Sequence, residues 1–310
     1  AVIETNGALT LTLGTTTGSV AWPASGGFSA GGGNLSVTLN NNAALTWGIT
    51  SNFTLSTNEL TFNSFTADGA VTLNNPISLS TGGRTVRVTD NVNSAADYAF
   101  LAGGLISAAG GALIKQGTGL LEWSAASTFT GGISIRMGYL RGSQANLNLA
   151  NQNLVFSVTT GTAAVLETSG TILSDIGAST GSIQWVQIST TGGSSGGFSA
   201  YGGTLGVTLN NSTDTNLVWG AGGFLVNGTT SAGELQFGSI LSDNVITFNN
   251  PINLSDQARS IRVFDNPNTT ADYAIMTGVL SSTTPASGAI IKQGSGTLVL
   301  TADSTFTGLS

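Results

Sequence analysis

Hydrophobic and polar residues alternate in short runs along the whole chain. Typical runs are LSVTL (35–39), RTVRV (84–88) and VITF (245–248), each bounded by Gly, Asn, Asp or Ser. Alternation with a period of two is the pattern of a strand with one buried face, and the bounding residues favour tight turns. Helical periodicity is hard to find. The pattern therefore predicts an all-β protein built from many short strands.

The chain also contains an internal duplication. Residues 26–39 (GGFSAGGGNLSVTL) return as residues 196–209 (GGFSAYGGTLGVTL), and residues 1–7 (AVIETNG) resemble residues 164–170 (AVLETSG). Because the spacing between copies drifts along the chain, small insertions are expected in loops. We expect a first repeat over 1–133 that begins within a repeat unit, connecting coils over 134–163, and a second repeat over 164–310 that ends within one.

Two folds accept many short strands: an antiparallel sandwich or barrel, and a parallel β-helix (β-solenoid). A repeat of ~170 residues without a change in composition favours the β-helix, with about seven coils of ~20–25 residues in each repeat. The large aromatic residues are then expected in the core, above all Trp47, Phe62, Trp219 and Phe237.

Composition narrows the chemistry. Charged residues make up 7% of the chain and the net charge is −7, so no basic patch is available for nucleic acid. The absence of His and Cys excludes disulfides, histidine chemistry, thiol nucleophiles and the usual zinc sites. No apolar run approaches the ~20 residues of a transmembrane helix, and no signal peptide is visible, so an export signal is expected outside this chain.

One motif near residue 111 recurs near residue 288. The first copy is GALIKQGTGLLEW, STFTGG and ISIRMGYLRG, and the second is GAIIKQGSGTLVL and STFTG. This pattern resembles the autotransporter-associated β-strand repeat of the passengers of giant bacterial surface proteins, with Phe in place of the usual Tyr and with Trp123 interrupting the first alternation. The residues that match are Gly111, Lys115, Gly117, Gly119, Leu121, Thr128, Phe129, Gly131, Gly138, Leu140 and Gly142, and then Gly288, Lys292, Gly294, Gly296, Leu298, Leu300, Thr305, Phe306 and Gly308.

The resemblance implies a right-handed parallel β-helix that is exported and then displayed on the bacterial surface or released. It implies an extracellular location and no single activity. No cofactor is expected, apart from the calcium considered below. Because no cap is visible at either end, the expected partners are copies of the chain or further repeats stacked head to tail.

Carboxylates are the only candidates for catalysis, as in β-helical polysaccharide lyases and hydrolases, where a pair about 5–10 Å apart can act as acid and base. An active site usually occurs once in a chain, whereas a structural feature repeats with the scaffold. The sequence therefore predicts a protein that is not an enzyme, because these acids occur in pairs: Glu4 and Glu167, Glu59 and Glu234, Asp68 and Asp243, Asp90 and Asp265, Asp97 and Asp272.

Two other polar groups recur. Arg84 and Arg87 stand three apart on an alternating strand, so they face opposite sides, and one of them is expected to pair with Asp90 or with an acid of a neighbouring coil. The second group is the loop DNVNSAAD (90–97) with its copy DNPNTTAD (265–272), which offers hard oxygens that suit Ca²⁺. Asp and Asn also cap turns, and both interpretations stay open for Asp90, Asn93, Asp97, Asp265, Asn268 and Asp272.

Three functions remain. The first is a structural protein, a segment of an extracellular filament, coat or surface stalk, because the repeats extend a stack and no cap is visible at either end. The second is an adhesin whose exposed aromatics stack on glycans. The third, a β-helical polysaccharide enzyme, is opposed by the twofold redundancy of the acids. The aromatic candidates for the adhesin are Trp22, Tyr139, Trp185 and Tyr201.

Overall fold

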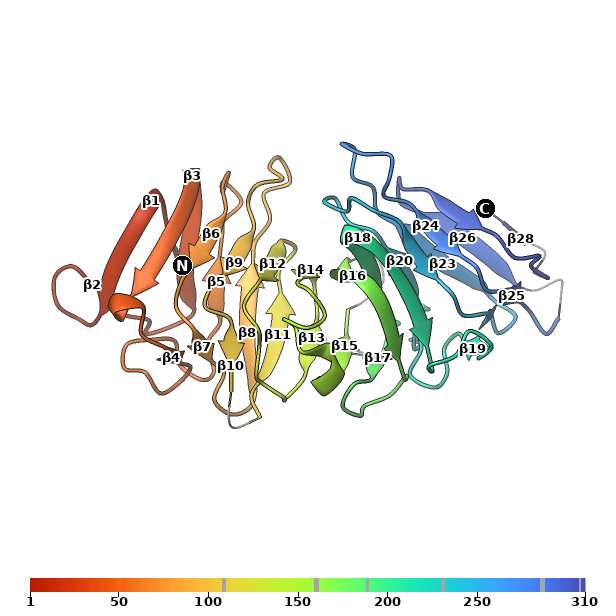
Figure 1. Cartoon of the computed structure of the whole chain (residues 1–310), viewed down its shortest axis with the longest axis horizontal. Coiled ribbons are helices and arrows are strands. Elements are labelled where there is room, and N and C mark those ends of the chain that lie inside the picture. Colours follow the sequence, from red (N-terminus) through yellow and green to blue (C-terminus); the bar gives the residue numbers. More distant parts are fainter. Residues whose placement is uncertain are drawn as a thin grey trace. The chain divides into compact units, whose positions relative to one another are not determined.

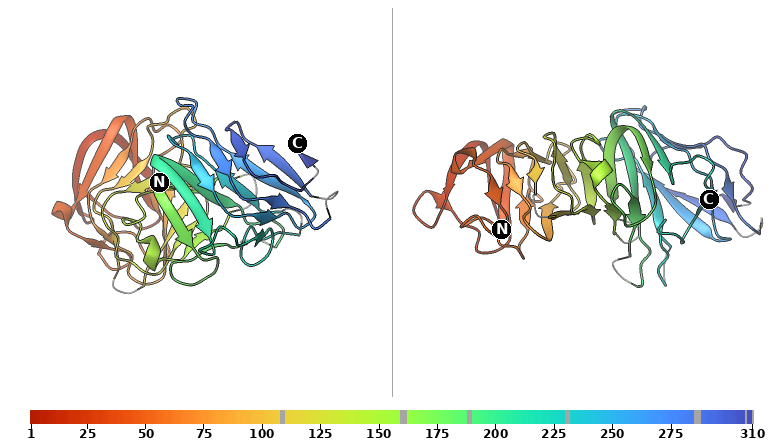
Figure 2. Two further views of the ribbon diagram at one scale, coloured as in Figure 1. Left: turned by 45° about the vertical axis from the view of Figure 1, so that its right-hand side comes forward. Right: turned by 60° about the horizontal axis from the view of Figure 1, so that its bottom comes forward.

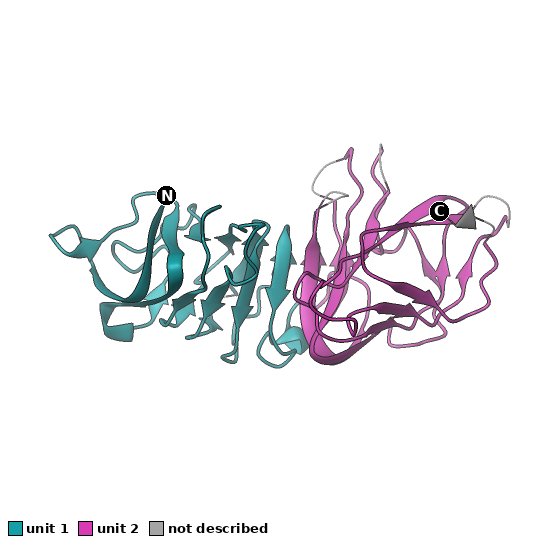
Figure 3. Cartoon of the chain, turned by 90° about the horizontal axis from the view of Figure 1, so that it is seen from above, with its two compact units in different colours: residues 1–152 teal, residues 153–310 magenta. Residues whose placement is uncertain are grey.

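The chain forms two compact all-β units. The computed structural model describes residues 1–107, 110–158, 162–187, 190–229, 232–284, 288–306 and 308–309, and these contain strands and two 3₁₀ turns but no α-helix. The first unit covers residues 1–152 and the second covers residues 153–310 (Figure 3). The division falls inside the segment 134–163 that the sequence analysis places between the repeats, whose exact limits stay a prediction.

Unit 1 is a parallel β-helix in which each coil stacks on the previous one (Figure 1). Three series of strands run along the stack, and every pairing between its named strands is parallel. The first series is β1 (Val2–Leu13), β3 (Gly26–Leu39), β5 (Leu60–Phe62), β8 (Gly83–Val88), β11 (Ala112–Gln116) and β13 (Ile133–Ile135). The second continues the later halves of β1 and β3 with β6 (Val71–Leu73), β9 (Ala99–Leu101), β12 (Leu120–Trp123) and β14 (Gly138–Arg141). The third is β4 (Leu45–Thr46), β7 (Ile77–Ser78) and β10 (Leu105–Ile106). Strand β2 (Ser19–Val20) pairs with β1. The two 3₁₀ turns are η1 (Asn40–Asn42) and η2 (Leu149–Asn151).

Unit 2 repeats this plan, and Figure 2 shows its strands from two further sides. Its first series is β16 (Ala164–Ser174), β18 (Gly196–Leu209), β20 (Glu234–Phe237), β23 (Ala258–Val263), β26 (Ala289–Gln293) and β28 (Gly308–Leu309). The second continues from β18 with β21 (Ile246–Phe248), β24 (Ala274–Met276) and β27 (Leu298–Leu300). The third is β19 (Leu217–Val218), β22 (Ile252–Asn253) and β25 (Leu280–Ser281), and β15 (Leu154–Phe156) pairs with β17 (Ile183–Trp185).

The coils are fewer and less regular than the sequence analysis expects. Among the described residues, the first series of each unit has six strands, where about seven coils are expected. One coil takes 19 residues where Ala289 pairs with Gly308, and 41 where Leu205 pairs with Ile246. Coil length varies because the segments that connect the strands differ in length, which strand periodicity alone does not reveal.

Alternation along each short strand builds the core. In β5, β6 and β9 the first and third side chains are buried and the second is half-buried. Strand pairing places Phe28, Phe62 and Val88 in one inward column, and all three are fully buried. Each such side chain removed from water stabilises the fold by roughly 1.5–3 kcal/mol.

The aromatic residues expected in the core are there. Trp47, Phe62, Trp219 and Phe237 are no more than 1% exposed. Trp22 and Trp185 are also buried, at 6% and 1%, so the structure contradicts their use as exposed platforms for glycans. They pack edge-on against Phe28 and Phe198, respectively.

Candidate functional site

Lys115 is the central polar residue of the recurring motif. It stands on β11 at an inward position, between Val86 of the previous coil and Ile135 of the next, and its side chain is fully buried. Its ammonium donates to the carbonyl oxygens of Gln116 (3.0 Å), Gly117 (2.7 Å) and Met137 (2.9 Å). Burial lowers the pKa of Lys115 well below its usual value. This amine therefore closes its own turn and bonds that turn to the next coil.

Lys292 is the counterpart in unit 2. It donates to the carbonyl oxygen of Gly294 at 2.5 Å, and it is half-buried. Burial lowers its pKa as well, while the charge of Asp265 opposes this effect. The two copies thus share the bond within the turn.

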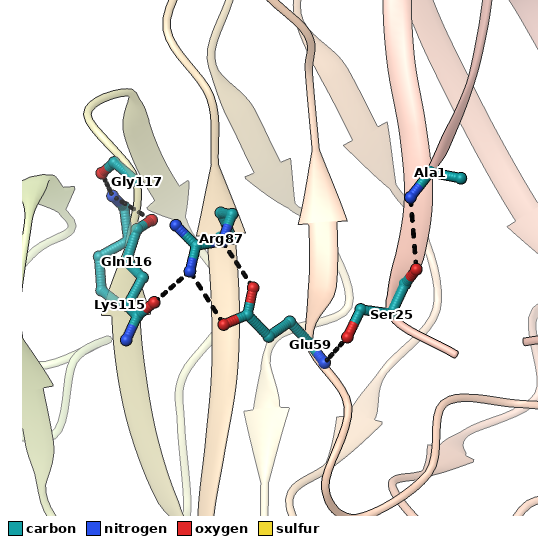
Figure 4. A network of polar contacts seen from close by, with 7 residues as sticks. All are labelled: Ala1, Ser25, Glu59, Arg87, Lys115, Gln116 and Gly117. Atoms are coloured by element: carbon teal, nitrogen blue, oxygen red, sulfur yellow. Dashed lines mark hydrogen bonds and ion pairs between the residues drawn. The ribbon is translucent and has the colours of Figure 1, made fainter. Parts of the chain in front are cut away.

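Arg87 bridges three coils on the outer face of unit 1. Its guanidinium contacts Glu59 of the previous coil, with Nε 2.5 Å from Oε2 and Nη2 3.0 Å from Oε1, and Nη2 also donates to Gln116 Oε1 of the next coil. Figure 4 shows this row of side chains continuing to Ser25, whose Oγ accepts the Glu59 N–H at 2.9 Å. The hydrogen bond to Glu59 raises the pKa of Arg87. Of the two acids considered for this pair, the structure selects that of the neighbouring coil.

The same row occurs in unit 2. Arg262 contacts Glu234 at 2.8 Å and 3.2 Å, and it donates to Gln293 Oε1. Here the Glu234 side chain is fully buried, whereas 28% of the Glu59 side chain is exposed. Gln236 donates a further hydrogen bond to Glu234 at 2.9 Å. The acid of the second copy is therefore less exposed to water and has this additional hydrogen bond.

Arg84 and Arg259 face the opposite way, as the alternation predicts. Both are buried, and burial lowers the pKa of each. Arg84 donates to the carbonyl oxygens of Leu79 (2.9 Å) and Ser56 (2.7 Å). Arg259 donates to Leu254 O (2.8 Å) and Asn227 Oδ1 (2.9 Å), and it lies 5.8 Å from the ring centre of Trp219. These guanidinium groups fasten loops to the inside of a coil.

The motif glycines stand where neighbouring coils pass closely. Gly117 has φ +77°, and a Cβ there would lie 2.1 Å from the Val88 carbonyl oxygen. Gly294 has φ +76°, and its Cβ would lie 2.2 Å from Val263 O. Both conditions exclude a side chain. Buried Leu121, Phe129 and Leu140 fill the interior beside this turn.

The loop 90–97 makes the contacts of a capped turn. Asp97 Oδ2 accepts the Asn91 N–H at 2.6 Å, and Asn91 Oδ1 accepts the Asn93 N–H at 3.2 Å. Asp272, Asn266 and Asn268 repeat this arrangement at 2.7 Å and 3.1 Å. Burial raises the pKa of Asp97 to about 6, and it also raises the pKa of Asp90. Among the described residues no three acids gather as a metal centre, and calcium binding at either loop stays a prediction.

The remaining paired acids accept hydrogen bonds from the scaffold. Glu4 accepts from Ser29 at 2.7 Å and Ser64 at 2.5 Å, and the hydrogen bond from Ser64 contributes most to lowering its pKa. Glu167 accepts from Ser199 at 3.0 Å and also from Ser239. Asp68 and Asp243 cap backbone N–H groups of the tight turns at Gly32 and Gly202.

Sequence reasoning missed the function of two asparagines. Asn75 and Asn250 are fully buried. Asn75 accepts from Leu39 N and donates to Leu39 O and Ala43 O, while Asn250 forms the same bonds to Leu209. Their place before a proline indicated a turn, and only their identical recurrence in both repeats could have signalled a bond between coils.

The comparisons with known proteins agree with the motif. The model of the passenger-associated-transport-repeat family matches residues 113–141 and 290–309, about a sixth of the chain. The chain is similar to that family over both copies of the motif, including Lys115 and Lys292. No curated protein and no solved structure matches the chain. Within the described residues, no helix has the length and apolar character that crossing a bilayer would need.

Proposed function

We propose that this chain is a non-enzymatic structural protein, a segment of an extracellular bacterial filament, coat or surface stalk in which β-helical coils stack. The match to a passenger-associated repeat supports surface display or secretion. The partners are then further coils of the same kind, in the same chain or in other copies.

One observation carries this proposal: the polar groups of the motif bond coil to coil in both repeats. Arg87 and Arg262 each link an acid of the previous coil to a glutamine of the next. Asn75 and Asn250 bond backbone groups about one coil away. Contacts that recur in both repeats are best explained as structural, because each repeat must form hydrogen bonds to its own buried polar groups.

The paired acids support the absence of catalysis. Glu59 and Glu234 are held by arginine, and Asp97 and Asp272 cap turns. A general acid or base must instead reach a substrate and exchange a proton with it. The twofold recurrence of these contacts explains the acids without a reaction.

Electron microscopy of the purified chain over a range of concentrations tests the proposal. The expected result is filaments one β-helix wide that lengthen with concentration. Ile3 on β1 pairs with buried Phe28 of β3 and is itself 45% exposed, so Ile3→Lys should shorten the filaments, because a coil packed over this side chain would bury an unpaired charge. Val92→Lys is the matched control, since Val92 is 87% exposed in a loop. Dispersed single particles at every concentration would refute self-assembly of this chain.

A pocket in unit 2 favours glycan binding as a second candidate function. It has a volume of about 760 Å³, and Asp265, Asp272, Tyr273 and Thr297 contribute to its lining. Hydroxyl and carboxylate groups beside an aromatic ring are the chemistry that binds sugars. Glycan-array binding that Tyr273→Ala abolishes would support an adhesin, and an array without binding would remove it.

A further inference from the structure

Arg259 in unit 2 is a buried cation without a carboxylate partner. Its side chain is fully buried, and its guanidinium donates to Leu254 O at 2.8 Å and to Asn227 Oδ1 at 2.9 Å. In the part of the chain that the structure describes, the buried Nη2 atom has no hydrogen-bond partner, and no carboxylate forms an ion pair with this guanidinium. Because a buried charge is costly unless an opposite charge compensates it, the group that this site lacks is an acid.

The asparagine that Arg259 contacts begins an Asn-Gly pair. Gly228 follows Asn227, and because glycine has no Cβ, its nitrogen can approach the side-chain amide of the residue before it. Within the described residues, neither the Gly228 N–H nor the Asn227 Nδ2 has a hydrogen-bond partner, whereas Asn227 Oδ1 accepts from Arg259. The attacking and leaving nitrogens are therefore both free, and the carbonyl oxygen between them is held by a cation.

We propose that Asn227 is a modification site at which Arg259 promotes spontaneous conversion of the asparagine to aspartate. The Gly228 nitrogen attacks Cγ of Asn227, and Nδ2 leaves as ammonia together with the proton of that N–H. Water then opens the cyclic imide between Cγ and the nitrogen, which returns a proton to the nitrogen and leaves a carboxyl group on the side chain. The guanidinium stabilises the negative charge that develops on Oδ1 in these steps.

The product supplies the acid that Arg259 lacks. The new carboxylate takes the place of an amide that the guanidinium already contacts at 2.9 Å. Opening the imide at its other bond would give isoaspartate, which lengthens the main chain by one methylene. The main chain has no room for this, because even a Cβ at Gly228 would lie 2.4 Å from Thr191 O. Aspartate is therefore the expected product.

Unit 1 does not repeat this arrangement. Arg84, the counterpart of Arg259, donates instead to the backbone carbonyl oxygen of Ser56, which has no amide to lose. The scaffold therefore does not require an asparagine at this position, and the structural explanation of the recurring contacts does not extend to Asn227.

The other Asn-Gly pair of the chain provides an internal control. Asn6 is exposed on β1 and precedes Gly7, but its Nδ2 donates to Gly31 O at 3.3 Å and to Gly32 O at 2.9 Å. These bonds hold the leaving nitrogen, and no cation among the described residues bonds to the Asn6 amide oxygen. Asn6 should therefore resist conversion in the folded chain, although its local sequence is equally reactive.

Peptide mass spectrometry during incubation of the purified chain at mildly alkaline pH tests the proposal. In the folded chain, Asn227 should convert at least about tenfold faster than Asn6, because one charged hydrogen bond to the reacting oxygen has at least this effect. In urea the two rates should become similar, because both pairs are then unfolded. The proposal is overturned if Asn227 is no faster than Asn6 in the folded chain, if its advantage persists in urea, or if isoaspartate is its main product.

Arg259→Gln separates activation from mere positioning of the loop. Loss of the guanidinium should slow the conversion of Asn227 by about tenfold. If Arg259 only held the loop, the looser loop of the variant would convert at the same rate or faster, which would overturn the proposal. Arg84→Gln is the matched control and should leave the rate at Asn227 unchanged. The comparison of Asn227 with Asn6 in the unmodified chain remains decisive if Arg259→Gln does not fold.

Asn227→Asp installs the product directly. Its melting temperature should exceed that of the unmodified chain by about 2–4 °C, because the buried guanidinium gains a counter-ion. Asn6→Asp is the matched control and should give no rise, since the new carboxylate would face the carbonyl oxygens of Gly31 and Gly32. An unchanged or lower melting temperature for Asn227→Asp would contradict the pairing with Arg259. None of these measurements requires filaments, so the outcome is independent of the proposed function.

Discussion

Lys115 Nζ lies 2.9 Å from the carbonyl oxygen of Met137, although 22 residues separate them. A buried amine therefore joins two coils through backbone groups, whose positions do not depend on which side chains the next coil carries. Arg87 and Glu59 join coils through side chains instead. The passenger-type motif thus combines one contact that tolerates sequence change with one that does not.

Lys115→Met should destabilise the protein by about 2 kcal/mol, because it leaves buried carbonyl oxygens without a donor. Lys292→Met is the matched control and should cost less than about 1 kcal/mol, since Lys292 is half-buried and donates to Gly294. Denaturant titration of the three proteins measures both changes. Equal losses would show that the bond to the next coil contributes nothing.

The two arginine rows should differ in strength. Arg262→Met is expected to cost about 3 kcal/mol, because it leaves the fully buried carboxylate of Glu234 without its cation. Arg87→Met should cost no more than about 1 kcal/mol, because water reaches both side chains of its pair. Repeating the titrations in 1 M salt should weaken the first unit's pair and leave the second nearly unchanged. A reversed order would contradict the inference from burial.

Asp97 should make stability depend on pH. Burial raises its pKa from 3.8 to about 6 in the folded protein, so folding favours the protonated form. Its stabilising contribution is complete below about pH 4 and is lost as the pH rises to about 6 and beyond, a change on the order of 2 kcal/mol. Asp97→Asn should remove this part of the pH dependence and make the protein more stable at neutral pH.

Ala67→Ser supplies the converse variant. Ser242, the counterpart of Ala67 in unit 2, has its hydroxyl 3.1 Å from Asp272 Oδ2. A hydroxyl at position 67 should therefore lower the pKa of Asp97 by donating to its charged form. Titration of the Asp97 carboxyl by NMR in both proteins measures the shift, and an unchanged or higher pKa would disprove this role for the hydroxyl.

Gly117→Ala should be far more costly than Gly82→Ala. Both glycines have φ +77°, so both variants carry the strain of about 1 kcal/mol for a side chain in the left-handed region. A Cβ at Gly82 meets nothing within 4 Å, whereas one at Gly117 would lie 2.1 Å from Val88 O. Gly117→Ala must therefore push two coils apart, and we expect a loss above about 3 kcal/mol or failure to fold. Similar melting temperatures for the two variants would contradict this close approach.

Local rules were sufficient for the strands and for the faces of their side chains. Alternation predicted that Arg84 and Arg87 face opposite sides, because neighbouring positions on a strand point to opposite sides. Phe62 and Phe237 were expected in the core as large aromatic residues. The duplication revealed a stacked architecture, since each repeat needs another to cover its open face. The sequence by itself thus determined the all-β class and the repeat.

The partners across coils were decided by tertiary structure alone. Arg87 pairs with Glu59, 28 positions away, rather than with Asp90 only three positions away. Lys115 turns inward to carbonyl oxygens of two coils, and Trp22 and Trp185 are buried rather than exposed. The physical reason is the uneven coil length: loops of different size shift each coil relative to the chain, so spacing along the sequence does not specify which residues lie above one another.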